Sequence, residues 1–345
     1  MGMDMNKRFD GLTGVRGVGA LGIIAYHVYV LGGYSGSSHY LDRTVGVGGV
    51  FVQLFFMLSS FSLMCGYAEK FRQKDYDLET FYIGRFRKLA PAFYFALLCY
   101  FLLDWWEGSP DSIYALFGTG SFLYALMPAH QESVVMAGWA LGIEVVFYLL
   151  FPAWLIFTKN KKRAWLMLAF TAGLFLAYNR FYGIGAEQAH ININHQLVFF
   201  AAGSLLYHYI PKIQKLSGKY RILFGVLCLA VETACLFLWG RLDGNLILVI
   251  AFSAWILNQV NGFDKIMECG IMKWIGSISY PMYLFHMIVY RLLMHTGWKG
   301  YLEQRIPKVP LQYLLFYLTV TAGTILLSAL FRFVSGRITK GLRNS

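Results

Sequence analysis

The chain has 345 residues, of which 57% are hydrophobic and 14% charged, and its mean hydropathy is +0.52. Soluble domains carry about 25% charged residues, so this composition excludes an ordinary soluble enzyme and indicates an integral membrane protein. The formal net charge of +12 does not predict a nucleic-acid partner, because the Lys and Arg residues lie in loops between apolar runs.

Ten apolar runs follow one another along the chain, and about 20 such residues are enough to cross a bilayer as a helix. They cover residues 9–31, 46–66, 86–103, 138–158, 164–180, 196–210, 222–239, 244–260, 272–293 and 311–334. The eighth run is short, and the ninth is compatible with two pieces. We expect an all-α integral membrane protein, a bundle of about ten transmembrane helices that forms a single membrane domain over residues 1–345. We expect no soluble extracytoplasmic domain.

The first run carries two polar side chains, Arg16 and His27, which lie eleven positions apart. Eleven steps of about 100° place both on one face of a helix, about 16 Å apart along its axis. A charge inside a membrane helix costs at least about 2.5 kcal/mol and usually serves a function. The structural alternatives are that Arg16 extends toward the headgroups and that His27 bonds a neighbouring helix. Lys7 and Arg8 before the run resemble a signal peptide, but we expect an uncleaved helix.

The distribution of basic residues predicts the orientation of the chain. With the N-terminus placed in the cytoplasm, 22 of the 30 Lys and Arg residues fall in inside segments and seven in outside segments. Both termini are therefore predicted to be cytoplasmic. This puts Arg16 toward the cytoplasm and His27 toward the outer leaflet. The five cysteines show no metal-ligand spacing, so we expect buried thiols and no metal site.

Two polar connections lie on the predicted outer side. The longer one, residues 105–137, is acidic and contains an apolar stretch at 113–127. That stretch is about fifteen residues long, which is short for a span and typical of a re-entrant piece. If it spans instead, every later loop changes side and the charge bias collapses. The acids in or beside this connection are Asp104, Glu107, Asp111 and Glu132, and the second polar segment covers residues 178–195.

Five phrases resemble the membrane acyltransferase-3 family and occur in that family's order. They are FDGLTGVRGVGALGIIAYH at 9–27, GGVFVQLFFMLSSF at 48–61, FYIGRFRKLAP at 81–91, GWALGIEVVFYLLFP at 138–152 and SYPMYLFH at 279–286. The resemblance implies transfer of an acyl group, usually acetyl from acetyl-CoA, to a hydroxyl of a cell-surface or secreted carbohydrate or of a small molecule. It also implies a multi-pass protein of the bacterial cytoplasmic membrane. Either outer connection is placed to close over such an acceptor.

Acyl transfer to a hydroxyl requires a base, oxyanion donors and a site for the coenzyme phosphates. His27 is the candidate base, because neutral imidazole titrates near working pH. Whether His27 is itself acylated stays open. Arg85, Arg87 and Lys88, together with Arg16, are the candidate coenzyme site, since arginine forks bind phosphate. From charge alone, an ordinary cluster of inside-loop basic residues is the stronger interpretation; the resemblance reverses this order. Lys88 departs from the family phrase, which has an arginine there.

Glu144 is a second candidate catalytic residue, because it lies in an otherwise apolar helix. It is placed to orient His27 or to pair with Arg16, and the alternative is a purely structural ion pair. Tyr148 follows one turn later on the same face. Val145 occupies the position of the second acid that the family phrase often has, which argues against two adjacent catalytic carboxylates.

A second histidine, His286, shares one helical stripe with Tyr280 and Tyr283 and is a candidate for binding the acceptor; packing is the alternative. In the second phrase, Gln53 replaces the family's aspartate and Ser60 its late glycine. We expect that phrase to serve packing or substrate shape.

These observations predict an O-acetyltransferase in which acetyl-CoA docks from the cytoplasm and the acceptor hydroxyl meets His27 and Glu144 toward the outer face. A transporter or flippase of a sugar or lipid, without chemistry, is the alternative. A third possibility is a membrane module that works with a separate extracytoplasmic transferase. The oligomeric state, homo-oligomers included, stays open.

Overall fold

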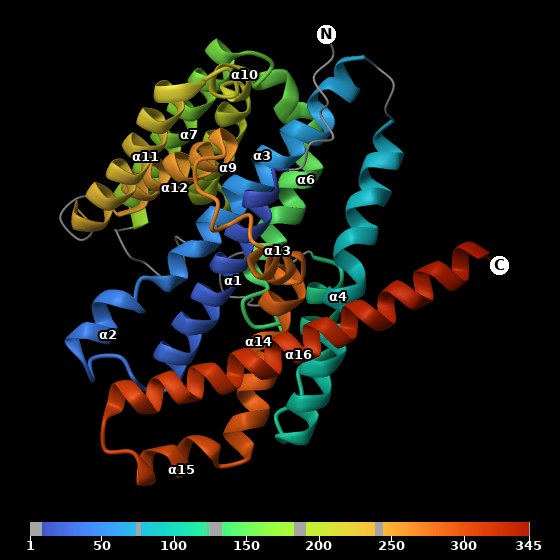
Figure 1. Cartoon of the computed structure of the whole chain (residues 1–345). Coiled ribbons are helices and arrows are strands. Elements are labelled where there is room, and N and C mark those ends of the chain that lie inside the picture. Colours follow the sequence, from blue (N-terminus) through green and yellow to red (C-terminus); the bar gives the residue numbers. More distant parts are fainter. Residues whose placement is uncertain are drawn as a thin grey trace.

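The computed structural model describes residues 9–73, 77–122, 124, 133–182, 191–238 and 244–344 (Figure 1). Within these ranges the chain is helical and contains no strand, as expected for an all-α protein. The long helices are α1 (Asp10–Leu31), α3 (Phe51–Arg72), α4 (Leu78–Trp106), α6 (Trp139–Phe157), α7 (Lys161–Tyr182), α9 (Ile193–Tyr207), α11 (Gly218–Leu238), α12 (Gly244–Asn261), α14 (Ser279–His295) and α16 (Val309–Asn344). The short elements are α2 (His39–Thr44), η1 (Gly48–Val50), α5 (Ile113–Gly120), α10 (Ile210–Ile213), α13 (Gly270–Ser277) and α15 (Trp298–Arg305).

Each of the ten apolar runs overlaps one long helix. The ninth run overlaps the short helix α13 as well as α14. Five helices among the described residues are long and apolar enough to cross a membrane. They are α1, a continuous stretch over His39–Arg72, α4, α6 and α16 up to Arg337. The helical class is therefore confirmed, and several membrane spans are supported. The number of about ten spans stays a prediction.

Helix α1 lies at the centre of the bundle, where it packs against α3, α12, α13, α14 and α16 (Figure 1). Glycines permit this close packing. A Cβ atom built on Gly276 of α13 would lie 1.7 Å from the carbonyl oxygen of Thr13, and one on Gly48 would lie 2.5 Å from that of Gly22. Only glycine lets two backbones approach so closely, as small residues do in membrane helix pairs. The central position puts both Arg16 and His27 among neighbouring helices.

The remaining helices form two groups around α1. Helix α3 packs on α9, which contacts α7 and α12, and α12 pairs with α11. On the other side, α14 packs between α4 and α16. In Figure 1 most of the first group lies at the upper left, whereas α14 lies below the centre and α16 runs from the lower left to the C-terminus at the right. The candidate residues of α1 thus lie where the two groups meet.

Hydrogen bonds join helix ends that the sequence assigned to the same side of the membrane. Arg72 donates to the carbonyl of Lys159 at 2.5 Å, and Arg221 donates to that of Gly262 at 2.6 Å. Further pairs at these ends are Lys273 with Asp10 and Arg332 with Ser277. The relative directions of these helices agree with the prediction, whereas the cytoplasmic location of both termini stays a prediction.

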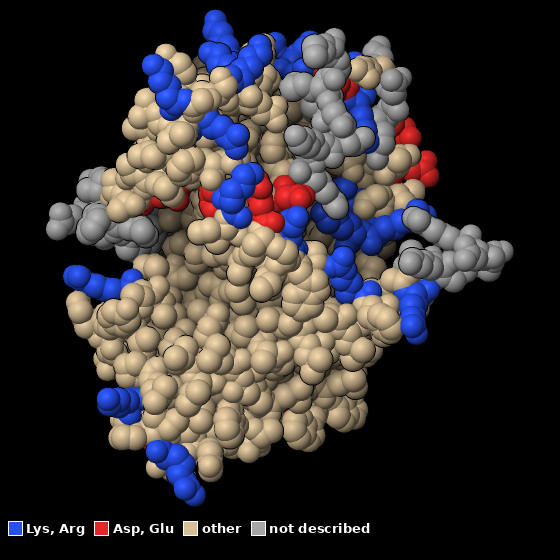
Figure 2. Space-filling view, in the orientation of Figure 1, with Lys and Arg blue, Asp and Glu red and all other residues tan. Residues whose placement is uncertain are grey.

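The outward surface of the bundle is strongly apolar. Phe170 of α7 is 60% exposed and Leu326 of α16 is 71% exposed, and Leu102 and Leu149 are similarly open. Figure 2 shows most Lys and Arg side chains in the upper half of one face, above a broad surface that is nearly free of charge. Such a surface belongs in lipid, where exposed apolar side chains carry no cost, so the predicted membrane location is supported.

The acidic outer connection is described only in part. Helix α5 has eight residues, far fewer than a bilayer span requires. Residues 123 and 125–132 of this connection, with Glu132, lie outside the described residues, and so do residues 183–190 of the second connection. Whether 113–127 is re-entrant therefore stays a prediction.

Candidate active site

The two candidate histidines, 259 positions apart in the chain, meet between α1 and α14. His27 Nδ1 lies 3.0 Å from His286 Nε2, and the ring centroids are 4.9 Å apart. His286 Nδ1 in turn lies 2.7 Å from the backbone oxygen of Tyr283. The structure therefore makes His286 a direct neighbour of the candidate base.

This chain of contacts fixes the proton positions in the neutral histidine pair. A carbonyl oxygen only accepts, so His286 Nδ1 must carry the proton that it donates to Tyr283. In neutral His286, Nε2 is then an acceptor, and His27 Nδ1 must donate to it. Neutral His27 is left with a lone pair on Nε2, the tautomer that a general base requires.

His27 lines a pocket of about 490 Å³ near the end of α1. Gln53 and Trp139 also line it, as do Gly46 and Gly49 of the segment before α3. The Gln53 side chain is buried, and its Oε1 has no hydrogen-bond partner among the described residues. The sequence assigned Gln53 to packing or substrate shape. The polar group that Gln53 presents to the pocket was indicated only by its position, where the family phrase has an aspartate.

Glu144 belongs to a second polar cluster, between α3, α4 and α6. Ser59 Oγ donates to Glu144 Oε1 at 2.5 Å, and the Tyr148 hydroxyl donates to the same oxygen. Arg85 lies with its guanidinium carbon 6.0 Å from the Tyr148 ring centre and 4.9 Å from that of Tyr67, whose hydroxyl accepts from Arg85 Nη2 at 2.5 Å. Arg85 is thereby linked to Glu144 through Tyr148, and Tyr67 holds the other side of its guanidinium.

The structure gives Glu144 other partners than those suggested from the sequence. Among the described residues, Glu144 bonds Ser59 and Tyr148 and neither His27 nor Arg16, and His286 takes the place beside His27. The physical reason is that a histidine on α14 already saturates the inward nitrogen of His27. Sequence reasoning missed Ser59, and the only available signal was its place in the second phrase, directly before Ser60.

Arg16 is held by α3 within the bundle. Its Nη2 lies 2.7 Å from Ser62 Oγ and 3.3 Å from the carbonyl oxygen of Leu58. The His27 pocket also borders α3, at Val52 and Gln53, so α3 lies near both polar side chains of α1. The alternative in which Arg16 merely reaches for the headgroups does not fit these contacts.

The basic phrase of α4 divides into two faces. Arg85 is half-buried against Tyr67, whereas Arg87 and Lys88 are exposed. The N-cap Asp77 holds the start of this helix, accepting from Thr80 N at 2.6 Å, and these hydrogen bonds hold the pKa of its carboxyl below the usual value. The phrase therefore presents one arginine to the interior and two cations to the outside of the bundle.

Tyr280 and Tyr283 anchor α14. The Tyr280 hydroxyl donates to the carbonyl of Leu89 at 2.9 Å, and the Tyr283 hydroxyl donates to that of Ala137 at 2.5 Å. These bonds fasten α14 to α4 and to the segment before α6, and so fix the position of His286. Tyr283 also lines the His27 pocket. Tyr280 thus fits the packing alternative, and Tyr283 combines packing with a place at the site.

Comparisons with known proteins show the family of the chain. A family model described as an acyltransferase domain matches residues 9–333. The chain is 24% identical over 333 residues to the peptidoglycan O-acetyltransferase OatA of Listeria monocytogenes, a match that covers 81% of this chain and 49% of that protein. It is 30% identical over 159 residues to protein 2 in the picA locus of Rhizobium radiobacter, covering 44% of this chain and 78% of that protein. The chain thus spans about half the length of the first relative, and no solved structure matches it.

Proposed function

This chain belongs to the membrane acyltransferase-3 family, and from this premise we propose that it is an acyltransferase that moves acetyl from cytoplasmic acetyl-CoA to a hydroxyl of a cell-envelope or secreted carbohydrate. The name of the Listeria relative, a peptidoglycan O-acetyltransferase, supports a carbohydrate acceptor. The proposed location is the bacterial cytoplasmic membrane, with the acceptor on the outer side.

The observation that carries the proposal is the contact between His27 Nδ1 and His286 Nε2 at 3.0 Å, beside a pocket that His27 lines. His27 Nδ1 is engaged by His286, which leaves His27 Nε2 with a lone pair beside the pocket. An acceptor hydroxyl donates its proton to this nitrogen while its oxygen attacks the thioester carbonyl, and the carbon–sulfur bond breaks. The proton then passes from the imidazolium to the CoA thiolate, so the products are an acetyl ester and free CoA.

His286 stabilises the cation that forms during this step. When His27 gains a proton on Nε2, its Nδ1–H bond to His286 Nε2 becomes charge-assisted and stronger. The same free Nε2 serves as the nucleophile if the acetyl group first rests on His27. A donor on the cytoplasmic side and an acceptor on the outer side suit either route.

The donor site in this proposal lies at the cytoplasmic end of α4. Arg85, Arg87 and Lys88 supply the cations for the coenzyme phosphates, with Arg16 deeper in the bundle. The half-buried Arg85 is backed by Tyr67 and Tyr148, and we assign Glu144 to holding this cluster through Tyr148. Glu144 then acts on the donor side and is a positioning residue.

The experiment measures acetyl-CoA binding and CoA release by the purified full chain in detergent. His27→Ala is expected to bind acetyl-CoA normally and to lose about 10²- to 10⁴-fold in turnover, as for loss of a general base. Arg85→Ala is expected to weaken coenzyme binding. His39→Ala and Arg305→Ala serve as controls, because both residues are exposed and neither lines the His27 pocket.

Two results would contradict the proposal. Full turnover by His27→Ala would remove His27 from the chemistry. Absence of acetyl-CoA binding by well-folded protein would favour the transporter alternative, because a carrier of sugars or lipids has no reason to bind this coenzyme.

A further inference from the structure

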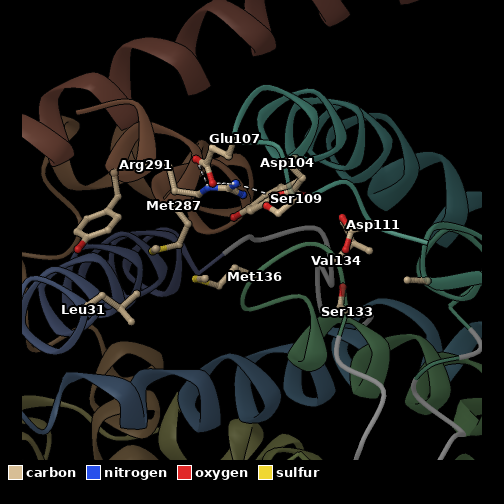
Figure 3. A pocket seen from close by; sticks show the side chains of 13 residues that line it. Leu31, Asp104, Glu107, Ser109, Asp111, Ser133, Val134, Met136, Met287 and Arg291 are labelled. Carbon is tan, nitrogen blue, oxygen red and sulfur yellow. Dashed lines mark hydrogen bonds and ion pairs between the residues drawn. The ribbon is translucent and has the colours of Figure 1, made fainter. Parts of the chain in front are cut away.

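A second pocket, of about 630 Å³, lies between the ends of α4 and α14 and the segment before α6 (Figure 3). Its volume falls within the range of about 300–1,000 Å³ that is usual for small-molecule sites. Polar side chains of two helices and one connection line it: Tyr100, Asp104, Glu107, Asp111 and Arg291. None of these residues was assigned a role in the reaction above.

Ion pairs hold the charged part of the lining in place. Arg291 Nη2 lies 2.5 Å from Asp104 Oδ1 and 2.6 Å from Glu107 Oε2, and Arg291 Nε lies 3.1 Å from Glu107 Oε1 (Figure 3). His295 Nε2 contacts the same Glu107 oxygen at 2.8 Å. With Asp111, three carboxylates face one arginine, so the described lining is acidic and disfavours an anionic ligand.

Two polar groups in this lining have no hydrogen-bond partner among the described residues. Tyr100 is 1% exposed, and its hydroxyl is buried and unpaired. Asp111 Oδ2 is also buried and has no partner, while the same carboxyl group makes a hydrogen bond with Asp104. A buried polar group without a partner costs free energy, which a ligand recovers by bonding it. A phenol donates and accepts, and a carboxylate accepts, so a ligand rich in hydroxyl groups complements both.

The pocket borders the His27 site. Leu31 lines both pockets, Met136 of this one is followed in the chain by Ala137 of the other, and Met287 directly follows His286. A sugar residue seated here therefore lies next to the His27 pocket, so the neighbouring residue of the same acceptor chain can extend its hydroxyl into that pocket. This adjacency is what an acceptor subsite requires.

We propose that this pocket is the acceptor subsite and that it holds an uncharged sugar residue, whose hydroxyl groups bond the Tyr100 hydroxyl and the Asp111 carboxylate. The assignment as an acceptor subsite rests on the proposed O-acetyltransferase function, whereas the sugar-binding site itself does not. The acidic lining selects against sugars that carry a carboxylate.

The test compares two ligands that differ only at C6: methyl β-glucoside and methyl β-glucuronide. Equilibrium dialysis of the full chain in detergent with each radiolabelled ligand is expected to show at least tenfold tighter binding of the glucoside. Tyr100→Phe removes one hydroxyl and is expected to weaken glucoside binding roughly tenfold. Tyr40→Phe, at a residue that is 73% exposed and outside both pockets, removes the same atom and is expected to change nothing. Asp111→Asn is expected to reduce the preference over the glucuronide.

Equal glucoside binding by the wild type and Tyr100→Phe would overturn the proposal, and so would absence of glucoside binding or a glucuronide that binds as tightly. Acetyl-CoA turnover, measured separately, distinguishes this failure from that of the proposed function. Tyr100-dependent sugar binding without acetyl-CoA turnover would leave the sugar site standing and refute the transferase. Normal turnover with Tyr100-independent binding would do the reverse.

Discussion

Replacing His286 by leucine tests the central feature of the site, the histidine pair. The substitution removes the acceptor for His27 Nδ1–H, now 3.0 Å away, and with it the link to the Tyr283 carbonyl. His286 then no longer selects the tautomer of His27, and the imidazolium formed during transfer loses its hydrogen bond to His286.

The expected size of the effect follows from the strength of that bond. Hydrogen bonds to charged groups contribute about 1.5–3 kcal/mol, and each 1.36 kcal/mol changes a rate about tenfold. The kcat of acetyl transfer should therefore fall roughly 10- to 100-fold. The KM for acetyl-CoA should stay unchanged, because the proposed coenzyme site lies on α4 and does not include His286. Its cations, in the first half of that helix, are Arg85, Arg87 and Lys88.

The assay is steady-state CoA release with a fixed acceptor, and it includes two further variants. His286→Gln retains an acceptor oxygen and should recover part of the lost kcat, which a purely structural role would not require. His39→Leu, at an exposed position, controls for the loss of a histidine. Wild-type kcat in a folded His286→Leu protein would refute the positioning role, and so would equal losses in the leucine and glutamine variants.

Three further predictions concern stability, each read as a thermal unfolding midpoint in detergent. Gly276→Val should destabilise the protein by about 1–3 kcal/mol or more, because the added Cβ meets the α1 backbone. Gly66→Ala, where a Cβ meets open space, should be neutral or stabilising. Equal effects of the two substitutions would contradict this packing. Ser59→Ala removes a donor to the Glu144 carboxyl and should cost about 1–3 kcal/mol, and an unchanged midpoint would contradict the contact. Burial and hydrogen bonding to a neighbouring carboxylate raise the pKa of Asp111 to about 6, so its contribution to stability is present below pH 4 and is lost as the pH rises through 6. Asp111→Asn should reduce this loss of stability with rising pH. Identical pH profiles of the unfolding midpoint in the variant and the wild type would refute the prediction.

The sequence alone determined the helical class and the approximate place of each long helix, although α4 begins eight residues before its run and α16 ends ten residues after its run. Runs such as 9–31 and 138–158 match α1 and α6 within about a residue, because an apolar run of that length has no other stable form in a bilayer. Local periodicity also placed Arg16 and His27 on one side of α1. The family phrases identified the class of enzyme.

The sequence also indicated Arg85 as a candidate coenzyme-binding residue but did not distinguish it from Arg87 and Lys88. Only the structure showed that Arg85 turns toward Tyr67 while Arg87 and Lys88 stay exposed. A one-residue step rotates a side chain by about 100°, but which direction faces the bundle depends on the helices packed around it. Those neighbours are not encoded within the phrase itself.

Contacts between distant segments were decided by the tertiary structure. The sequence offered Glu144 as a partner of either His27 or Arg16, whereas packing of α14 on α1 places His286 beside His27. The pocket around Tyr100 and Arg291 likewise requires α4 and α14 to lie side by side. Helical periodicity is a local property of a few turns, while the partner of a side chain is set by which helices pack together. That choice depends on shape complementarity over the whole bundle, so a linear pattern of residue types does not reveal it.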